Sequence, residues 1–225
     1  MATDITLFGH PFSSYTWKVL IALRERGLDY DFAEVGPDHP RHTALVNVAN
    51  PMGQFPVLEH DGRLVIESDV IIDYLDVAFP DAGEPMIPVD RLEAIEARQM
   101  SAVFDDYLQN HSGRVVYNNF QPEDERDPHV VRFSRSALQR VYRWLDGWME
   151  GKTWAAAGRF GIAECSAAPA LFYAHWVEPI PDELTALRNY RRRLLERPSI
   201  ASVVDDARYF RDYFPAPSGV DPDLS

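Results

Sequence analysis

The first ninety residues alternate between short apolar segments and helical patterns. Residues 4–9 (DITLFG) carry β-branched and aromatic side chains in loose alternation, which predicts a short strand. Over residues 15–30 the apolar positions follow a helical period, and Gly27 is a typical stop signal near its end. Residues 30–35 (YDFAEV) predict a second strand. Because a helix separates the two strands, we expect them to be parallel and joined by a right-handed crossover.

The next segment predicts an antiparallel hairpin followed by a helix. Two apolar stretches in residues 55–68 flank Asp61 and Gly62, and an Asp-Gly pair is a strong hairpin signal. A helical period follows over residues 67–79, with Ser68 as its expected N-cap. The order of elements in this half is therefore βαβ-ββα.

The chain changes character after residue 79. Three prolines in residues 80–90 predict a linker. Beyond it, long helical patterns without a convincing hairpin predict a second, all-helical domain over residues 91–214. The clearest of these patterns cover residues 91–109, 130–150 and 189–214. Residues 215–225 contain Pro and Gly but no apolar face, and we expect a flexible tail there.

Composition and charge narrow the range of functions. With 46% hydrophobic residues the chain of 225 residues can build a proper core. A net charge of −13 disfavours nucleic acid and anionic membrane surfaces as partners. The single cysteine, Cys165, excludes an internal disulfide and a Cys-x-x-Cys site. The N-terminus lacks signal-peptide features and no stretch approaches the length of a membrane span, so we expect a cytoplasmic protein.

Three hydroxyl groups lie where the first strand leads into the first helix. Residues 9–17 (GHPFSSYTW) contain Ser13, Ser14 and Tyr15 at this junction. A serine there can cap the helix, and capping alone would account for one of the two serines. The same hydroxyls could instead hold a ligand at the helix N-terminus, where the dipole favours negative charge.

Two further segments complete a pattern that resembles the cytosolic glutathione transferase family. Residues 50–58 read NPMGQFPVL, and the pair Glu67-Ser68 follows about ten residues later. Both pieces occur in order after a strand-helix entry, and the resemblance covers nearly the whole chain. It implies a glutathione transferase fold: a thioredoxin-like α/β domain that binds glutathione, followed by an all-α domain that binds the electrophile. We place these units at residues 1–79 and 91–214.

The resemblance also implies how the peptide part of glutathione is bound. The family holds the proline at the position of Pro56 in cis, so that the backbone of Phe55 pairs with the cysteinyl unit of glutathione. Gln54 would hydrogen-bond the peptide part of the same ligand. For the glycine carboxylate the expected residues are His42 or Arg41. Without the family pattern, Pro56 would fit an ordinary turn at a strand edge.

The γ-glutamyl end of glutathione is assigned in the same way. Ser68, at the start of a helix, offers a hydroxyl, backbone N–H groups and the positive end of the dipole to the γ-glutamyl carboxylate. Glu67 corresponds to the family's partner for the γ-glutamyl ammonium. Taken singly, Ser68 would fit a plain N-cap and Glu67 a solvated acid.

Ser13 is the predicted catalytic residue. Family members that use serine place it six residues before an apolar helical position, and Ser13 has this relation to Val19. Ser14 is the nearest alternative, because a shift of one residue in the loop would exchange their roles. Tyr15 could shape the pocket or donate its hydroxyl. The expected mechanism is stabilisation of the glutathione thiolate, with no general base.

The same segment departs from several branches of the family. It resembles the zeta-class signature, but Tyr15 stands where that class has cysteine and Lys18 where it has arginine, which argues against a zeta-type isomerase. Phe8 occupies the strand position of the catalytic tyrosine in other members and has no hydroxyl. The absence of cysteine from residues 1–164 argues against thiol–disulfide exchange.

The helical domain carries weaker signals. Polar and aromatic residues at near-helical spacing could line an electrophile pocket or an ordinary solvated face; they are Tyr107, Asn110, His111, Arg114 and Tyr117. The segment that resembles the family's buried helix has Gly161 and Glu164 at its capping-box positions, so we expect a half-built cap with slower folding or a substitute partner. Cys165 on this helix is predicted to be a buried, inert core residue.

The remaining candidates favour structural roles. Arg191, Arg192 and Arg193 are expected to be solvated because they point in different directions on a helix. Trp144 and Trp148 are expected in the core. The seven histidines lack ligand spacing, so no metal site is expected.

Together these features predict a glutathione transferase that conjugates glutathione, its co-substrate, to small hydrophobic electrophiles in detoxification. The alternatives are a non-catalytic protein that binds glutathione or another ligand on the same scaffold, and a zeta-like glutathione-dependent isomerase. The family resemblance also implies a homodimer.

Overall fold

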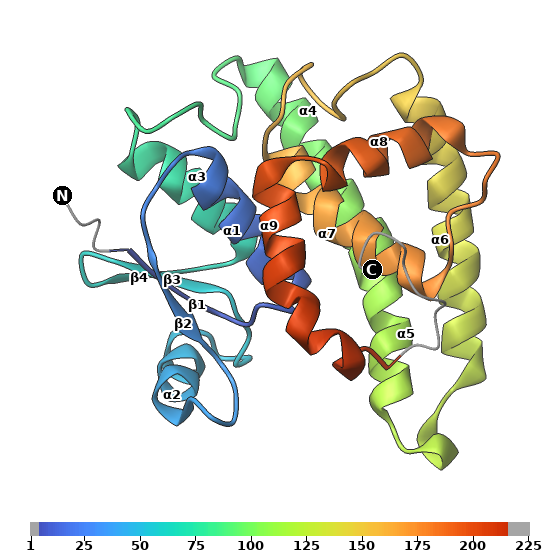
Figure 1. The fold of residues 1–225 in the computed structure, drawn as a ribbon, viewed down its shortest axis with the longest axis horizontal. Helices are drawn as coiled ribbons and strands as arrows, with labels where there is room; N and C mark the ends of the chain where they lie inside the picture. Colours follow the sequence, from blue (N-terminus) through green and yellow to red (C-terminus); the bar gives the residue numbers. More distant parts are fainter. Residues whose placement is uncertain (1–4, 216–225) are drawn as a thin grey trace.

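In the computed structural model, residues 5–215 are described. The chain forms two parts that lie side by side: a small sheet with three helices, and a larger group of helices (Figure 1). The first part is drawn in blue to cyan and the second in green to red. This arrangement confirms the predicted order of an α/β unit followed by an all-helical one. Of the predicted tail, residues 216–225 lie outside the described residues.

The sheet has four short strands in the order β2-β1-β3-β4. Their bounds are β1 Ile5–Gly9, β2 Asp31–Glu34, β3 Val57–His60 and β4 Arg63–Ile66. Strand β1 pairs with β2 in parallel and with β3 antiparallel, and β3 pairs with β4 antiparallel. The predicted parallel pairing of β1 with β2 and the hairpin at Asp61-Gly62 are therefore confirmed; both turn residues have positive φ.

Alternation along the strands divides the apolar side chains between two faces. Leu7 and Leu58 belong to the main core, which continues into the helical part, whereas Phe8 and Val57 belong to a second, smaller cluster. The helices α1 (Ser14–Glu25) and α3 (Ser68–Ala78) pack on the first face, and α2 (Pro40–Ala49) covers the other. Figure 1 shows α2 on the opposite side of the sheet from α1 and α3.

Helix α2 was not predicted, because residues 36–54 lack a strong apolar period. Pro40 occupies its first turn, where proline costs no hydrogen bond, and Val46 is its one buried residue. His39 is the N-cap residue, and the ring of His42 lies edge-on to Phe8 with 5.8 Å between centroids.

The start of α3 also differs from the prediction. Its N-cap is Glu67, without a capping side-chain bond, and Ser68 is the first residue of the helix. Glu67 has φ 68° and ψ 117°, a left-handed conformation that a non-glycine residue rarely adopts and that costs roughly 1–3 kcal/mol. Ser68 is buried. As the first residue of the helix, it places its hydroxyl beside this strained residue, together with the N–H groups of the first turn, which have no partner within the helix.

The connection between the two parts is held in place rather than loose. Asp76 on α3 accepts hydrogen bonds from the backbone N–H groups of Met86 (3.0 Å) and Ile87 (2.8 Å) and forms an ion pair with Arg26. The carbonyl of Met86 in turn accepts the N–H of Ile162 at 2.9 Å. Met86 and Ile87 are both buried. Residues 86–88 of the predicted linker are therefore packed between α3 and the helical part, while the rest of it is exposed or half-buried.

The helical part contains six α-helices among the described residues. They are α4 Arg91–Ala102, α5 Asn110–Phe120, α6 Pro128–Met149, α7 Ile162–Val177, α8 Thr185–Leu195 and α9 Pro198–Ala207. A π-helical segment, Val103–Gln109, joins α4 to α5 without a break. The single helical pattern expected over 189–214 is divided at Pro198, and it ends in a 3₁₀ segment, Arg208–Tyr213. No helix among residues 5–215 is both long and apolar enough to cross a membrane.

Helix α7 is the central helix of this part and is buried along almost its whole length. Glu164 accepts hydrogen bonds from the N–H groups of Gly161 (2.9 Å) and Ala155 (2.7 Å) and from the Tyr190 hydroxyl (3.1 Å). Gly161 has no side chain with which to complete the capping box, as predicted. A Cβ there would lie 2.5 Å from the Met86 carbonyl oxygen, which explains the glycine.

Three further expectations have mixed outcomes. Cys165 is a free, fully buried thiol, as predicted. Arg191 is buried, and its Nε lies 3.4 Å from the Leu171 carbonyl, so the expectation that it is solvated is wrong. Trp144 and Trp148 stack on each other with 5.3 Å between centroids, but Trp144 is 46% exposed and only Trp148 packs against the core.

Burial makes Glu164 a source of pH dependence. Desolvation raises its pKa to about 7, although its hydrogen bonds oppose this. The protonated form is thus favoured by folding, so this contribution to stability is complete below the unfolded pKa of about 4.5 and is lost as the pH rises through 7. The pKa difference corresponds to about 3 kcal/mol.

We predict that the free energy of unfolding of Glu164→Gln falls less between pH 5 and 8 than that of the wild type. At neutral pH the variant is expected to be less stable by about 1–3 kcal/mol, because an amide cannot accept from all three donors. Urea denaturation at a series of pH values measures both effects. Parallel pH profiles for the two proteins would contradict the assignment.

Candidate functional site

A cleft between the α/β part and the helical part contains two adjoining compartments. They share Ser13, Tyr15, Gln54, Phe55 and Tyr117 in their walls. The polar compartment has a volume of about 520 Å³ and is lined by these residues and by Asn50, Gly53, Pro56, Glu67, Ser68, Asp69, Asp105 and Asp106. The aromatic compartment has a volume of about 500 Å³ and includes His10, Phe12, Ser14, Arg114, Tyr173 and Phe214.

The loop that carries Ser13 is fixed from two sides. The Trp17 indole N–H donates to the Pro11 carbonyl at 2.6 Å, and the Tyr173 hydroxyl donates to the Phe12 carbonyl at 2.9 Å. Trp17 and Tyr173 are themselves buried, with 5.3 Å between their ring centroids. The loop is thereby anchored to both α1 and α7, and the position of Ser13 in the cleft depends on both parts of the molecule.

Ser13 is the N-cap of α1. Its extended backbone (φ −91°, ψ 124°) and the hydrogen bond that its Oγ accepts from the Thr16 N–H at 3.3 Å are typical of a cap. That bond occupies a lone pair of the oxygen and leaves the O–H free to donate. Capping and donation to a ligand in the cleft are therefore compatible. Ser14 is the first residue of the helix and lines only the aromatic compartment.

Tyr15 lies in the wall between the compartments and is 38% exposed. Burial raises its pKa to about 12, and the nearby carboxylates of Asp105 and Asp106 add to the rise. At neutral pH the phenol is thus protonated and can donate a hydrogen bond.

The structure brings most of the predicted glutathione-binding residues to the polar compartment. The bond Phe55–Pro56 is cis, as the family resemblance implied, and Gln54, Phe55 and Pro56 all line the compartment. Glu67 and Ser68 lie in the same wall, at the N-terminus of α3.

His42 and Arg41 lie outside both compartments. The Nδ1 atom of His42 is 2.7 Å from the Glu34 carbonyl oxygen; since a carbonyl only accepts, Nδ1 carries the proton. His42 also stacks on His39, with 5.5 Å between ring centroids. Arg41 is exposed on α2. Neither residue lines the cavity that holds the other candidates.

A buried cation lies behind the acidic wall of the polar compartment. Lys18 is 1% exposed, and its Nζ is 2.6 Å from Asp69 Oδ1 and in direct contact with Asp105 Oδ2. The second oxygen of Asp69 accepts the Ser101 hydroxyl at 2.8 Å. Lys18 comes from α1, Asp69 from α3 and Asp105 from the π-helical segment, so one ammonium joins the two parts at the site.

The π-helical segment places Asp105 against this cation. Burial raises the pKa of Asp105 to about 6, with Lys18 opposing the rise and the neighbouring Asp69 and Asp106 adding to it. π-Helical turns often occur at functional sites, because the extra residue in the turn re-aims side chains. The wall thus combines Glu67, Asp69, Asp105 and Asp106 and suits a ligand with a positively charged end.

The aromatic compartment has a different chemistry. Phe12, Tyr173 and Phe214 meet edge to face or stacked, with ring centroids 5.5–6.3 Å apart. From the helical wall considered in the sequence, Asn110, Arg114 and Tyr117 line the compartment. Tyr107 and His111 do not, and His111 packs against Phe133 instead. The compartment can therefore accept an apolar molecule beside a few hydrogen-bond donors.

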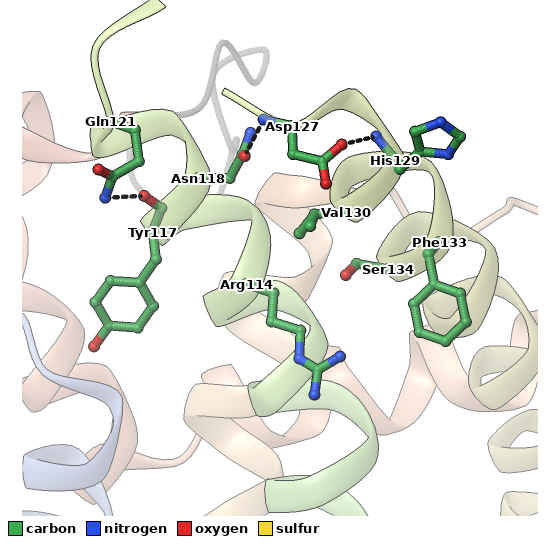
Figure 2. A pocket seen from close by; sticks show the side chains of 9 residues that line it. All are labelled: Arg114, Tyr117, Asn118, Gln121, Asp127, His129, Val130, Phe133 and Ser134. Atoms are coloured by element: carbon green, nitrogen blue, oxygen red, sulfur yellow. Dashed lines mark hydrogen bonds between the residues drawn. The ribbon is translucent and has the colours of Figure 1, made fainter. Parts of the chain in front are cut away.

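A third cavity, of about 600 Å³, lies between α5 and α6 (Figure 2). Arg114, Phe133 and Ser134 line it, and Figure 2 shows the Tyr117 ring on the side of α5 away from Phe133. None of the predicted catalytic or glutathione-binding residues reaches this cavity. Within residues 5–215 there is no group of three His, Cys, Asp or Glu side chains that could hold a metal ion.

Comparison with known families agrees with the fold and the cleft. The family model for the N-terminal domain of glutathione S-transferase matches residues 7–85, and that for the C-terminal domain matches residues 108–198. Together they cover more than half of the chain, and the chain belongs to the glutathione S-transferase family.

Three relatives are distant in sequence but are matched over at least 91% of their own length. Glutathione S-transferase A of Pleuronectes platessa is 27% identical over 206 residues, which are 89% of this chain and 91% of the relative. A glutathione S-transferase of Methylobacillus flagellatus, solved with glutathione bound, is 25% identical, covers 89% of this chain and 98% of its own, and has a TM-score of 0.78. A glutathione transferase of Phanerochaete chrysosporium has a TM-score of 0.81 at 20% identity, with coverage of 94% and 98%.

Sequence reasoning missed several residues of the site. Lys18 was noted only as a substitution for arginine, although a lysine inside the apolar run TWKVLIAL signals a paired buried charge. Asp69, Asp105 and Asp106 had no assigned role. The adjacent pair of acids in a helical pattern was the available signal, but only the fold shows that it faces Glu67.

We predict that Lys18→Met destabilises the protein by about 3 kcal/mol at pH 7.5, because the buried carboxylate of Asp105 loses the cation that offsets its desolvation. Asp105 becomes protonated below pH 6, so the difference from the wild type should be smaller at pH 5. Adding Asp105→Asn to Lys18→Met should restore part of the loss at pH 7.5. Urea denaturation at both pH values tests this; a loss that is independent of pH and of Asp105 would contradict the pairing.

Proposed function

We propose that this protein conjugates the thiolate of glutathione to small hydrophobic electrophiles, with Ser13 stabilising the thiolate. The observation that carries the proposal is the position of the Ser13 hydroxyl. It lies at the N-terminus of α1 and in the walls of both compartments, with its O–H free to donate. A sulfur at this point would have glutathione-binding groups on one side and an apolar cavity on the other.

Glutathione as co-substrate fits the polar compartment. The acidic wall around Glu67 suits the γ-glutamyl ammonium, and the first turn of α3 at Ser68 suits the adjacent carboxylate. The backbone of Phe55 would pair with the cysteinyl unit, with Gln54 close to the peptide part. The bound glutathione in the Methylobacillus relative supports this choice of ligand. The residue that binds the glycine carboxylate is unassigned, because neither His42 nor Arg41 lines the compartment.

The Ser13 hydroxyl and the N-terminus of α1 can supply the free energy that is needed to lower the thiol pKa of glutathione. Lowering a thiol pKa from about 8.5 to about 6.5 requires about 3 kcal/mol. A hydrogen bond to a charged acceptor contributes about 1.5–3 kcal/mol, and a helix N-terminus adds about 0.3–1 kcal/mol. The Ser13 hydroxyl and the N-terminus of α1 are thus sufficient without a general base. The thiolate then attacks the electrophile in the aromatic compartment.

We predict that Ser13→Ala lowers kcat/KM for 1-chloro-2,4-dinitrobenzene by about 10- to 100-fold, because one hydrogen bond to the thiolate is lost. The thiol pKa of bound glutathione, followed by thiolate absorbance, should rise, while the affinity for glutathione changes little. The variant should also lose about 1 kcal/mol of stability with its cap.

Ser14→Ala is the matched control and should leave the thiol pKa in place. If Ser13→Ala loses stability but the thiol pKa does not move, Ser13 is only a helix cap. If the wild type binds glutathione without turnover of any electrophile, the non-catalytic alternative replaces the proposal.

We also propose that the protein is a homodimer through an apolar patch on α3 and α4. Val70 and Val77 lie two helical turns apart on α3 and are 54% and 76% exposed, and Leu92 and Ile95 on α4 are 77% and 61% exposed. An ion pair of 3.1 Å between Asp73 and Arg98 brings these two helix faces together. Adjacent exposed apolar side chains of this size are typical of an interaction surface.

We predict that Val77→Asp shifts the sedimentation coefficient from that of a dimer toward that of a monomer, because a charge would be buried in the interface. Val48→Asp, at a site on α2 that is 86% exposed, is the matched control and should sediment like the wild type. A monomeric wild type would rule out the proposed interface.

A further inference from the structure

His10 lies in the wall of the aromatic compartment, in the loop that also carries Ser13. The loop turns tightly between them, since the Ser13 N–H donates to the His10 carbonyl at 3.0 Å. The imidazole packs against Phe210, with 4.6 Å between ring centroids. The His10 side chain is thus fixed from two sides and placed in the same cavity as the predicted catalytic hydroxyl.

The hydrogen bonds of His10 define its tautomer. The Phe12 N–H donates to His10 Nδ1 at 3.1 Å, so Nδ1 must present a lone pair. A neutral imidazole then carries its proton on Nε2. Burial lowers the pKa of His10, with the carboxylate of Glu34 opposing the change, so the ring is neutral at physiological pH.

The Nε2 atom remains available to a ligand. Among the described residues no group forms a hydrogen bond with Nε2. The buried side-chain atoms that lack a hydrogen-bond partner do not include Nε2. It is therefore accessible, on a ring that lines the cavity. Its neighbours in the wall are mostly apolar, including Phe12, Tyr173 and Phe214, and such surroundings strengthen a hydrogen bond.

We propose that His10 is a further catalytic residue, whose Nε2–H stabilises negative charge on an oxygen of the electrophile. The proposal rests on the conjugation reaction proposed above and assigns His10 a role in the turnover of activated carbonyl compounds, such as α,β-unsaturated ketones. These molecules combine an apolar body with one oxygen on which charge develops, matching an aromatic cavity that offers a fixed donor.

The chemistry balances without another reactant. The thiolate forms a carbon–sulfur bond at the β-carbon, and the carbon–carbon π electrons shift to give an enolate whose oxygen accepts the hydrogen bond from Nε2. Water then protonates the α-carbon. That proton replaces the one released to solvent when the glutathione thiol ionised, and His10 keeps its own proton throughout.

Two substitutions distinguish the roles of the two nitrogens of His10. Asn can place an amide oxygen near the position of Nδ1 and so keep the bond to the Phe12 N–H, but it has no group at the position of Nε2. Gln can place an amide N–H near Nε2. An enone, 4-phenyl-3-buten-2-one, is compared with 1-iodobutane, in which the charge develops on iodide and no oxygen needs a donor.

We expect His10→Asn to lower kcat/KM for the enone by about 100-fold, in the range found for loss of one oxyanion donor. Its activity toward 1-iodobutane should fall far less than its activity toward the enone, and its calorimetric affinity for glutathione should stay near that of the wild type. His10→Gln should recover most of the activity toward the enone. In addition, ¹⁵N NMR of the imidazole at pH 7 should show Nε2 protonated and Nδ1 unprotonated.

Each contrary result has a distinct meaning. An equal loss with both substrates would show that His10 acts through the Ser13 loop, and unchanged enone turnover or the opposite tautomer would also overturn the proposal. Binding of glutathione without turnover of either substrate by the wild type would instead refute the proposed conjugation. In that case the role of His10 falls with it.

Discussion

The buried ammonium of Lys18 determines how the cleft is built. It contacts Asp69 at the start of α3 and Asp105 in the π-helical segment, so that one charge joins the two parts of the molecule behind the ligand site. The buried carboxylate of Asp105 is costly unless a cation offsets its desolvation. Asp69 in turn fixes the first turn of α3 beside Glu67, whose left-handed backbone is held only by its surroundings. The shape and the charge of the polar compartment therefore depend on the same contact.

On the catalytic side of the cleft, Ser13 and His10 each combine a hydrogen bond to the backbone with a group that stays free for a ligand. The oxygen of Ser13 accepts the N–H of Thr16 in the first turn of α1, while its hydrogen stays free for a sulfur. In the same way, Nδ1 of His10 accepts the backbone N–H of Phe12, while Nε2 is open to the cavity. In both residues the hydrogen bond to the backbone orients the N–H or O–H group that is proposed to act on the substrate. The loop that carries them is anchored by Trp17 and Tyr173, so it keeps its geometry without a ligand.

The fold was largely predictable because its signals are local. Alternation in the strands, the Asp61-Gly62 turn and the helical period of α1 and α3 each lie within a few residues. Helix α2 has only one buried residue, so its period was too weak to recognise. Ser13, Gln54, Phe55, Pro56, Glu67 and Ser68 could be named from motif order, and the structure gathers them in one cleft. The partners of Lys18 and Asp105 could not, because the fold brings them together from distant segments, and the same holds for the packing of Phe210 against His10. Arg191 was misjudged since its burial is set by α7, which no pattern on its own helix reveals.

The segment around Met86 has a consequence for how such a chain can change. Its N–H groups are held by Asp76, and its carbonyl is held by the first turn of α7, so close that residue 161 has to be glycine. An insertion in this stretch would break contacts on both sides at once. Because Met86 enters these contacts through its backbone alone, a chimera with a relative has to keep Asp76 in one half, Gly161 in the other and the path of the backbone between them.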